Sequence, residues 1–156
     1  MANTFYNEIL TEHNLHPANR RDLPDANRVL EGVNPSCGDD IWLQLKVEDG
    51  VIEDAAFKGF GCAISQASAD MMVDLVIGRT EEEALRLADI FIRMIKGEAS
   101  EEELEELDEA AVLKDVSYMP ARVKCAVLGW HTLEEMLEDE EGEEKESPSG
   151  NEEQKK

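Results

Sequence analysis

The strongest constraint on the fold is a β-hairpin pattern in residues 41–57. From Ile41 to Val47, aliphatic side chains occupy every second position, and Trp42, Gln44 and Lys46 lie between them, which is typical of a strand with one buried face. Asp49 and Gly50 then give a hairpin turn signal, and residues 51–57 supply the returning strand. Because no crossover helix fits between these two strands, they must pair antiparallel.

The remainder of the chain favours helices on one side of this hairpin. Residues 28–33 predict a short edge strand, and residues 3–15 predict a first helix. Beyond Gly61 the apolar residues follow helical spacing, and Gly78 ends the first of these helices. Capping boxes begin two more helices at Thr80 with Glu83 and at Ser100 with Glu103, and Pro120 begins the last. We expect an α+β fold, with a small antiparallel sheet of about three strands packed against a layer of helices.

Length and charge limit the classes of function. The 156 residues suit one domain, which we place at residues 1–137. Residues 138–156 hold nine acidic and three basic residues with almost nothing apolar, so we expect an acidic disordered tail. A net charge of −22 argues against binding to nucleic acid or to a membrane surface. No apolar stretch is long enough to span a membrane and no signal peptide is evident, so we expect a cytoplasmic protein.

Three cysteines carry the chemical signal. Cys37, Cys62 and Cys125 are odd in number and widely spaced, which makes a poor disulfide framework. Cys37 lies in a turn-rich loop, two residues before Asp39, and Gly38 allows both side chains to point at one ion. A surface loop that happens to contain a cysteine is the plain alternative.

The other two cysteines are placed by predicted helices. Cys62 lies where the second hairpin strand ends and a helix begins, and the free N–H groups of a first helical turn stabilise a thiolate. Cys125 lies about one turn into the last helix, beside the predicted core stripe. Arg122 and Lys124 precede it closely, and nearby cations favour a thiolate. Each could instead be an ordinary buried cysteine.

Together these residues predict one shared metal site. Cys37, Asp39, Cys62 and Cys125 would supply three thiolates and one carboxylate, a set suited to zinc or ferrous iron. Structural zinc sites prefer cysteine and histidine. Since a carboxylate exchanges more readily than a thiolate, the set indicates a site that can open.

The three cysteine segments resemble those of the IscU/NifU-type iron–sulfur assembly proteins. The segments are Asn-Pro-Ser-Cys-Gly-Asp at residues 34–39, Lys-Gly-Phe-Gly-Cys-Ala-Ile-Ser at 58–65 and Arg-Val-Lys-Cys at 122–125. The resemblance covers about residues 3–137 and implies a SufE/NifU-like fold. Lys124 stands where IscU-type proteins have histidine, and the interval from Cys62 to Cys125 is about a helix longer. Both departures resemble the SufU branch.

The resemblance implies a function for the site. SufU-like proteins bind Zn²⁺ through the counterparts of Cys37, Asp39, Cys62 and Cys125 and accept sulfur from a SufS-type, pyridoxal-phosphate cysteine desulfurase. By motif position Cys37 would be the accepting thiolate, Arg122 would stabilise it, and downstream iron–sulfur assembly proteins would take the sulfur. The expected activity is that of a zinc-dependent sulfurtransferase-type acceptor that acts only with a desulfurase, and whether it counts as an enzyme stays open.

Two alternatives remain open from the residues. The same ligands could build a transient iron–sulfur cluster on Fe²⁺, as on an IscU-like scaffold, or the zinc could be purely structural. Other candidates are weaker. We expect His13 and His16 to be solvated residues near a helix end, and His131 to lie on the surface. Met71 and Met72 are expected in the core.

Overall fold

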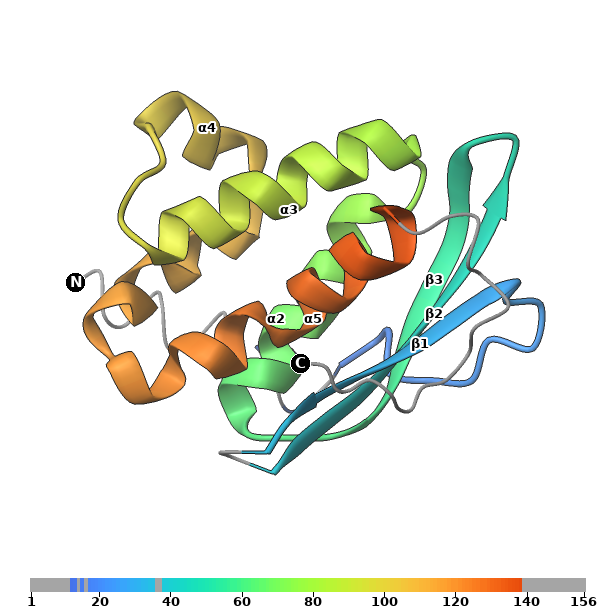
Figure 1. The fold of residues 1–156 in the computed structure, drawn as a ribbon, viewed down its shortest axis with the longest axis horizontal. Helices are drawn as coiled ribbons and strands as arrows, with labels where there is room; N and C mark the ends of the chain where they lie inside the picture. Colours follow the sequence, from blue (N-terminus) through green and yellow to red (C-terminus); the bar gives the residue numbers. More distant parts are fainter. Residues whose placement is uncertain (1–11, 14, 16, 36–37, 139–156) are drawn as a thin grey trace.

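The fold is an α+β arrangement in which a three-stranded sheet is covered on one face by helices (Figure 1). The computed structural model describes residues 12–13, 15, 17–35 and 38–138. Most of the helix predicted at residues 3–15 and most of the predicted tail lie outside this part of the chain. The strands are β1 (Arg28–Asn34), β2 (Asp39–Glu48) and β3 (Val51–Phe60); the helices are α2 (Ala63–Val76), α3 (Glu81–Ile95), α4 (Glu101–Glu106), the 3₁₀ segment η1 (Asp108–Tyr118) and α5 (Pro120–Glu138).

The sheet confirms the predicted hairpin and edge strand. Its order is β1-β2-β3 and both pairs are antiparallel. Asp49 and Gly50 both adopt positive φ, 56° and 78°, as the tight turn between β2 and β3 requires. The predicted inward row of β2, which starts at Ile41, is buried. The sheet therefore has one face committed to the core.

Helices α2, α3 and α5 form the second layer. Helix α5 packs against α2, α3 and β1, so it closes the core between the sheet and the other helices. Both predicted capping boxes are present, at Thr80 with Glu83 and at Ser100 with Glu103, and α5 begins at Pro120 as predicted. Met71 and Met72 are buried in the core, as expected. Within the described residues, none of the helices combines the length and apolar character that crossing a membrane requires.

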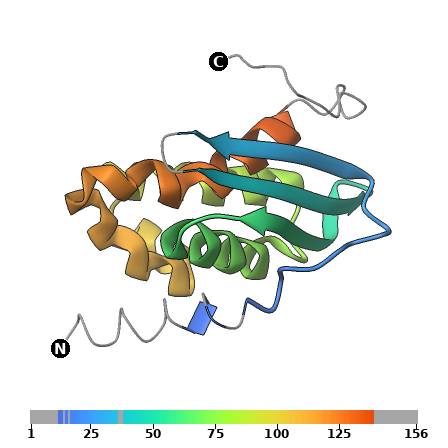
Figure 2. The same cartoon turned by 90° about the horizontal axis from the view of Figure 1, so that it is seen from below.

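The segment before β1 runs along α2 and the free edge of β3 (Figure 2). Asn19 accepts a backbone hydrogen bond from Phe57 and donates its side-chain amide to the Asp70 carbonyl on α2. Further on, the backbone N–H of Leu23 donates to the Gln44 side chain on the outer sheet face at 2.8 Å. This segment therefore covers part of the sheet face that the helices leave open.

Candidate metal centre

Three of the four predicted ligands meet at one end of the sheet. Asp39 is the first residue of β2, Cys62 caps the N-terminus of α2, and Cys125 lies in α5. A carboxylate oxygen of Asp39 and the two sulfur atoms all lie within 4.8 Å of one another. Figure 1 shows the start of β2 and the start of α2 at the same end of the molecule. Residues 86 positions apart in sequence are thus brought together by the sheet and two helices.

Asp39 is fully buried and points inward, in the same row as Ile41. Its Oδ1 accepts a hydrogen bond from the Cys62 backbone N–H at 2.9 Å. Its Oδ2 lies 3.5 Å from the side-chain amide nitrogen of Asn34, its register partner on β1. A buried carboxylate is costly unless such donors or a cation compensate it. These contacts leave Asp39 oriented toward the two sulfur atoms.

Cys62 occupies the N-cap position of α2 in an extended backbone conformation. Its sulfur accepts a hydrogen bond from the Ser65 backbone N–H at 3.5 Å, in the way that a serine or aspartate oxygen usually caps a helix. The predicted junction of strand and helix is confirmed. The first turn of α2 therefore directs a peptide donor at this sulfur.

Gly61, directly before Cys62, lies so close to Asp39 and Ser65 that only glycine fits there. A β-carbon at this position would lie 2.8 Å from Asp39 Oδ1 and would also overlap the Ser65 hydroxyl oxygen. No side chain fits without moving the carboxylate. The glycine therefore allows β3 to pass directly against the proposed ligand.

Cys125 is fully buried on α5. Its sulfur lies 3.9 Å from the Asn34 amide nitrogen, which donates toward it. The helix is fixed behind it by Ser68 of α2, whose hydroxyl donates to the Ala126 carbonyl at 2.6 Å and accepts from the Trp130 indole N–H at 3.0 Å. Trp130 in turn stacks on Phe91 with ring centroids 4.5 Å apart. Core packing thus sets the position of this sulfur.

Two further residues were predicted for the site, Cys37 and Arg122. Cys37 is outside the described residues. Its neighbour Gly38 has φ of +77° and donates its backbone N–H to the Asn34 carbonyl at 2.9 Å. Arg122 lies in the first turn of α5 and is exposed.

The donor set fits a zinc or iron ion. Ligand atoms around a tetrahedral ion with bonds of about 2.0–2.3 Å are separated by roughly 3.3–3.8 Å, so the three groups need only a small contraction. Cysteine sulfur and carboxylate oxygen are both ligands of zinc, and a divalent cation would offset the cost of burying the Asp39 carboxylate. Cys37 would complete a set of four.

A second polar cluster was missed by the sequence analysis. His13 is buried, not solvated as expected: Nδ1 lies 2.6 Å from Asp70 Oδ2 and Nε2 lies 2.8 Å from Glu109 Oε1. The prediction failed because helical spacing does not reveal a partner 57 residues away. The available signal was Asp70 itself, an acidic residue among the apolar positions of α2. His131 is exposed, as expected, and His16 lies outside the described residues.

Glu31 and Asp40 lie close together on the outer sheet face, where Asp40 directly follows the proposed ligand Asp39. A hydrogen bond to Asp40, burial and the negative charge of Asp40 raise the pKa of Glu31 from 4.5 to about 7. Asp40 Oδ1 is buried and finds no hydrogen-bond partner among the described residues.

Comparison with known proteins agrees with the fold. The family described as NifU-like N terminal domain matches residues 5–126. The iron-sulfur cluster assembly scaffold protein IscU of Thermotoga maritima is 44% identical over 132 residues, which cover 85% of this chain and 92% of that protein. The zinc-dependent sulfurtransferase SufU of Bacillus subtilis is 40% identical over 139 residues, covering 89% and 93%.

A solved structure extends this agreement to three dimensions. The crystal structure of a putative iron–sulfur cluster assembly scaffold protein for the SUF system from Fervidobacterium islandicum has a TM-score of 0.74 and 36% identity. The match covers 83% of this chain and 94% of that one. The chain therefore belongs to the NifU-like N-terminal domain family, the IscU/SufU group of iron–sulfur cluster assembly proteins.

Proposed function

We propose that this protein is a zinc-binding sulfur acceptor that takes persulfide sulfur from a SufS-type cysteine desulfurase, in the cytoplasm. One observation carries the proposal: a buried carboxylate, Asp39, stands beside two cysteine sulfurs in a donor set that can hold zinc yet release one ligand. The 40% identity to a relative named for zinc-dependent sulfur transfer supports it.

Cys62, Cys125 and Asp39 hold the site, and Cys37 reacts. Bound zinc would keep the thiolates deprotonated at neutral pH. The Cys37 thiolate attacks the outer sulfur of the desulfurase persulfide, so that a new S–S bond forms on Cys37 while the old S–S bond breaks. The electron pair of the broken bond leaves with the desulfurase cysteine as its thiolate. Arg122, at the start of α5, is proposed to stabilise the attacking thiolate.

The test combines metal content with sulfur transfer. We expect about one zinc per chain in protein purified without chelators, and a desulfurase turnover that rises when the chain is added. Mass spectrometry of the alkylated mixture should place the extra sulfur on Cys37. Cys37→Ala should remove stimulation while Cys62→Ser removes most of the zinc. Metal-free protein that still stimulates, or sulfur appearing first on Cys125, would contradict this assignment.

The scaffold function is the second candidate, favoured by the Thermotoga relative, which is named a scaffold. Asp39→Ala separates the possibilities because the carboxylate is the readily exchanged ligand. In a site that must open, the variant should alter sulfur acceptance at temperatures where the fold is intact. A variant that instead accumulates visible cluster absorbance after anaerobic reconstitution with Fe²⁺ and sulfide would favour the scaffold. Lower thermal stability with unchanged acceptance would indicate purely structural zinc.

A further inference from the structure

The outer face of the sheet carries a contiguous apolar patch at the metal end. Val33, Trp42 and Phe60 have exposed fractions of 52%, 40% and 64%. The strand register places Val33 opposite Asp40 and Asp40 opposite Phe60, with Trp42 one row away. Diagonal neighbours on one sheet face lie about 7–8 Å apart, so these three side chains form one surface, here called the sheet patch.

The fold covers the middle of that face with its own chain. Gln44 and Leu23 are each only 7% exposed because the segment before β1 crosses the sheet there. The Gln44 amide donates to the Arg21 carbonyl at 2.9 Å, and Asn27 bonds the backbone of Val47 in both directions. The uncovered part of the face therefore comprises the rows next to the metal centre and the β1 edge, where Val29 is 38% exposed. Apolar groups left open in this way commonly mark an interaction site.

The sheet patch continues directly into the proposed metal centre. Phe60 precedes Cys62 by two residues, which at about 3.3–3.6 Å per residue places their backbones roughly 7 Å apart. Val33 precedes Asn34, the residue whose amide donates toward Asp39 and Cys125. A standard protein interface buries about 800 Å² on each partner. A partner that brings its own cysteine to the metal centre therefore also contacts the surface beside it, either on the sheet or on the helices.

Charge around the patch indicates the chemistry of the partner surface. Glu31 and Asp40 lie between the apolar side chains. Lys58, opposite Trp42, is paired with Asp22 at 2.6 Å, so its charge is compensated within the chain. The patch thus presents apolar anchors beside two carboxyl groups on β1 and β2, while the Arg20 guanidinium, which donates to the Gly59 carbonyl at 2.6 Å, lies next to Phe60. The complementary surface is an apolar hollow with basic groups on the side that faces Glu31 and Asp40.

We infer that the sheet patch is the anchor on which the cysteine desulfurase docks when it delivers sulfur to this site. The inference rests on the proposed sulfur transfer and adds the surface on which it takes place. Phe60 is the central anchor, since it has the highest exposed fraction of the patch and lies nearest in sequence to Cys62. Trp42 and Val33 flank it.

The deciding experiment is a titration of the SufS-type desulfurase from the same cell with the wild-type chain and with Phe60→Ser. We expect the half-saturating concentration to rise about tenfold, as for an interface anchor, while stimulation at saturation stays unchanged. Zinc content and circular dichroism should match wild type. Ile77→Ser is the matched control: Ile77 is also exposed, at 37%, but follows the end of α2 that lies away from Cys62. It should leave the titration unaltered.

Two further measurements make the result decisive. Tyr118→Ser, at an 82% exposed position just before α5, tests the helix side of the metal centre. With fluorotryptophan incorporated into this chain alone, the ¹⁹F resonance of Trp42 should shift on adding desulfurase, while that of fully buried Trp130 should not.

Each outcome has a fixed meaning. If wild type stimulates and Tyr118→Ser weakens docking while Phe60→Ser does not, the desulfurase uses the helix side and the inference is overturned, although the proposed function stands. A concentration-dependent Trp42 shift without desulfurase would make a second copy of this chain the occupant, and would also overturn it. If wild type neither binds nor stimulates, both the proposed function and the inference fail.

Discussion

At Asn34, one buried amide serves two proposed ligands. Its side-chain nitrogen donates toward Asp39 Oδ2 at 3.5 Å and toward the Cys125 sulfur at 3.9 Å, while its backbone carbonyl accepts a hydrogen bond from the Gly38 N–H. Residues that orient metal ligands typically change metal affinity by 10–100-fold when removed. Asn34 is therefore a positioning residue for the site.

Asn34→Ala should accelerate transfer of zinc to a competing chelator by about tenfold or more. In cobalt-substituted protein, the visible ligand-field bands should also shift, because the carboxylate and sulfur lose a common donor. Asn27→Ala is the control: it removes two hydrogen bonds with the Val47 backbone, at 2.8 and 3.0 Å, from a distant part of the sheet. It should lower thermal stability without changing zinc release. Equal zinc release by both variants would reduce Asn34 to a structural residue.

Individual residues of the site differ in how well the sequence predicts them. Asp39, Cys62 and Cys125 were predicted as one cluster, and they meet within 4.8 Å, because short motifs at strand and helix ends fix local direction. Asn34 is the first residue of the segment at residues 34–39, but its contacts with Asp39 and Cys125 depend on the strand register and on the position of α5. No local sequence pattern encodes either of these. His13 was misassigned for the same reason, since its partners are 57 and 96 residues away.

Among the elements, His13 ties the N-terminal segment to α2 and η1. Burial alone would lower its pKa, but hydrogen bonds to Glu109 and Asp70 outweigh burial and raise the pKa above 6.5. A raised folded-state pKa means that the protonated form is the stabilised one. The contribution is therefore fully present below about pH 6.5 and is lost as pH rises through the raised pKa.

We expect His13→Gln to lower the free energy of unfolding by about 1–3 kcal/mol at pH 6, as for hydrogen bonds to charged groups. Denaturant titrations between pH 6 and 9 should show the difference between variant and wild type shrinking as pH rises. His131→Gln, at an exposed site, controls for loss of a histidine. A difference that stays constant with pH would show that His13 acts through packing alone.

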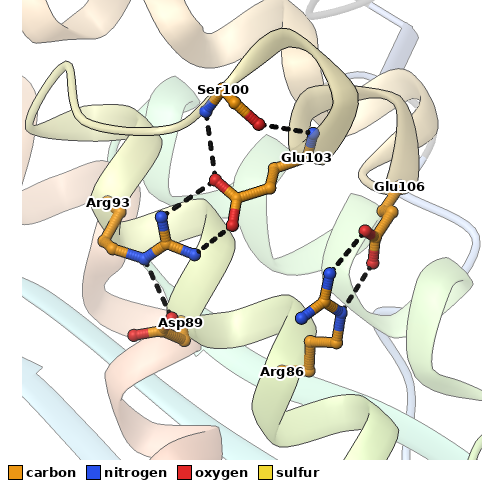
Figure 3. A network of polar contacts seen from close by, with 6 residues as sticks. All are labelled: Arg86, Asp89, Arg93, Ser100, Glu103 and Glu106. Carbon is orange, nitrogen blue, oxygen red and sulfur yellow. Dashed lines mark hydrogen bonds and ion pairs between the residues drawn. The ribbon is translucent and has the colours of Figure 1, made fainter.

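The helices α3 and α4 are joined by a network of arginine and glutamate side chains (Figure 3). Arg93 makes two hydrogen bonds to Glu103, at 2.9 and 2.7 Å, and one to Asp89. Glu103 also completes the α4 capping box with Ser100. Arg86 pairs with Glu106 nearby at 2.7 Å. The capping box was predictable from sequence, whereas the ion pairs between the helices were not, because they depend on how α4 folds back.

Acid should loosen α4 before it unfolds the core. The hydrogen bond to Arg93, followed by that from Ser100, lowers the pKa of Glu103 from 4.5 to about 2. A depressed pKa stabilises the fold above pH 4.5, and this contribution is lost as pH falls toward 2. Amide hydrogen exchange in residues 101–106 should rise over that range in wild type. Glu103→Gln should show the fast exchange at all pH values, and Glu106→Gln, in the more exposed pair, should show a smaller change. Equal effects would contradict the central place of Glu103.

For the whole molecule, charge and apolar contact have separable roles in docking. A net charge of −22 over 156 residues gives a long-range attraction to a basic partner surface, and salt screens that attraction over a Debye length of about 10 Å at 0.1 M. The sheet patch acts only on contact, and salt does not weaken burial of apolar side chains. Electrostatic complementarity therefore governs encounter, and Phe60 governs the lifetime of the complex.

These roles predict distinct salt responses. In stopped-flow binding to the desulfurase, raising NaCl from about 50 to 300 mM should slow wild-type association by roughly tenfold or more, as for electrostatically steered pairs, with little change in dissociation. Phe60→Ser should keep the same salt slope for association but dissociate about tenfold faster at every concentration. Sucrose at matched osmolality controls for effects other than screening. If salt leaves association unchanged, the acidic surface does not steer this encounter. If the Phe60 variant loses the salt slope instead, the patch acts through charge and not through apolar contact.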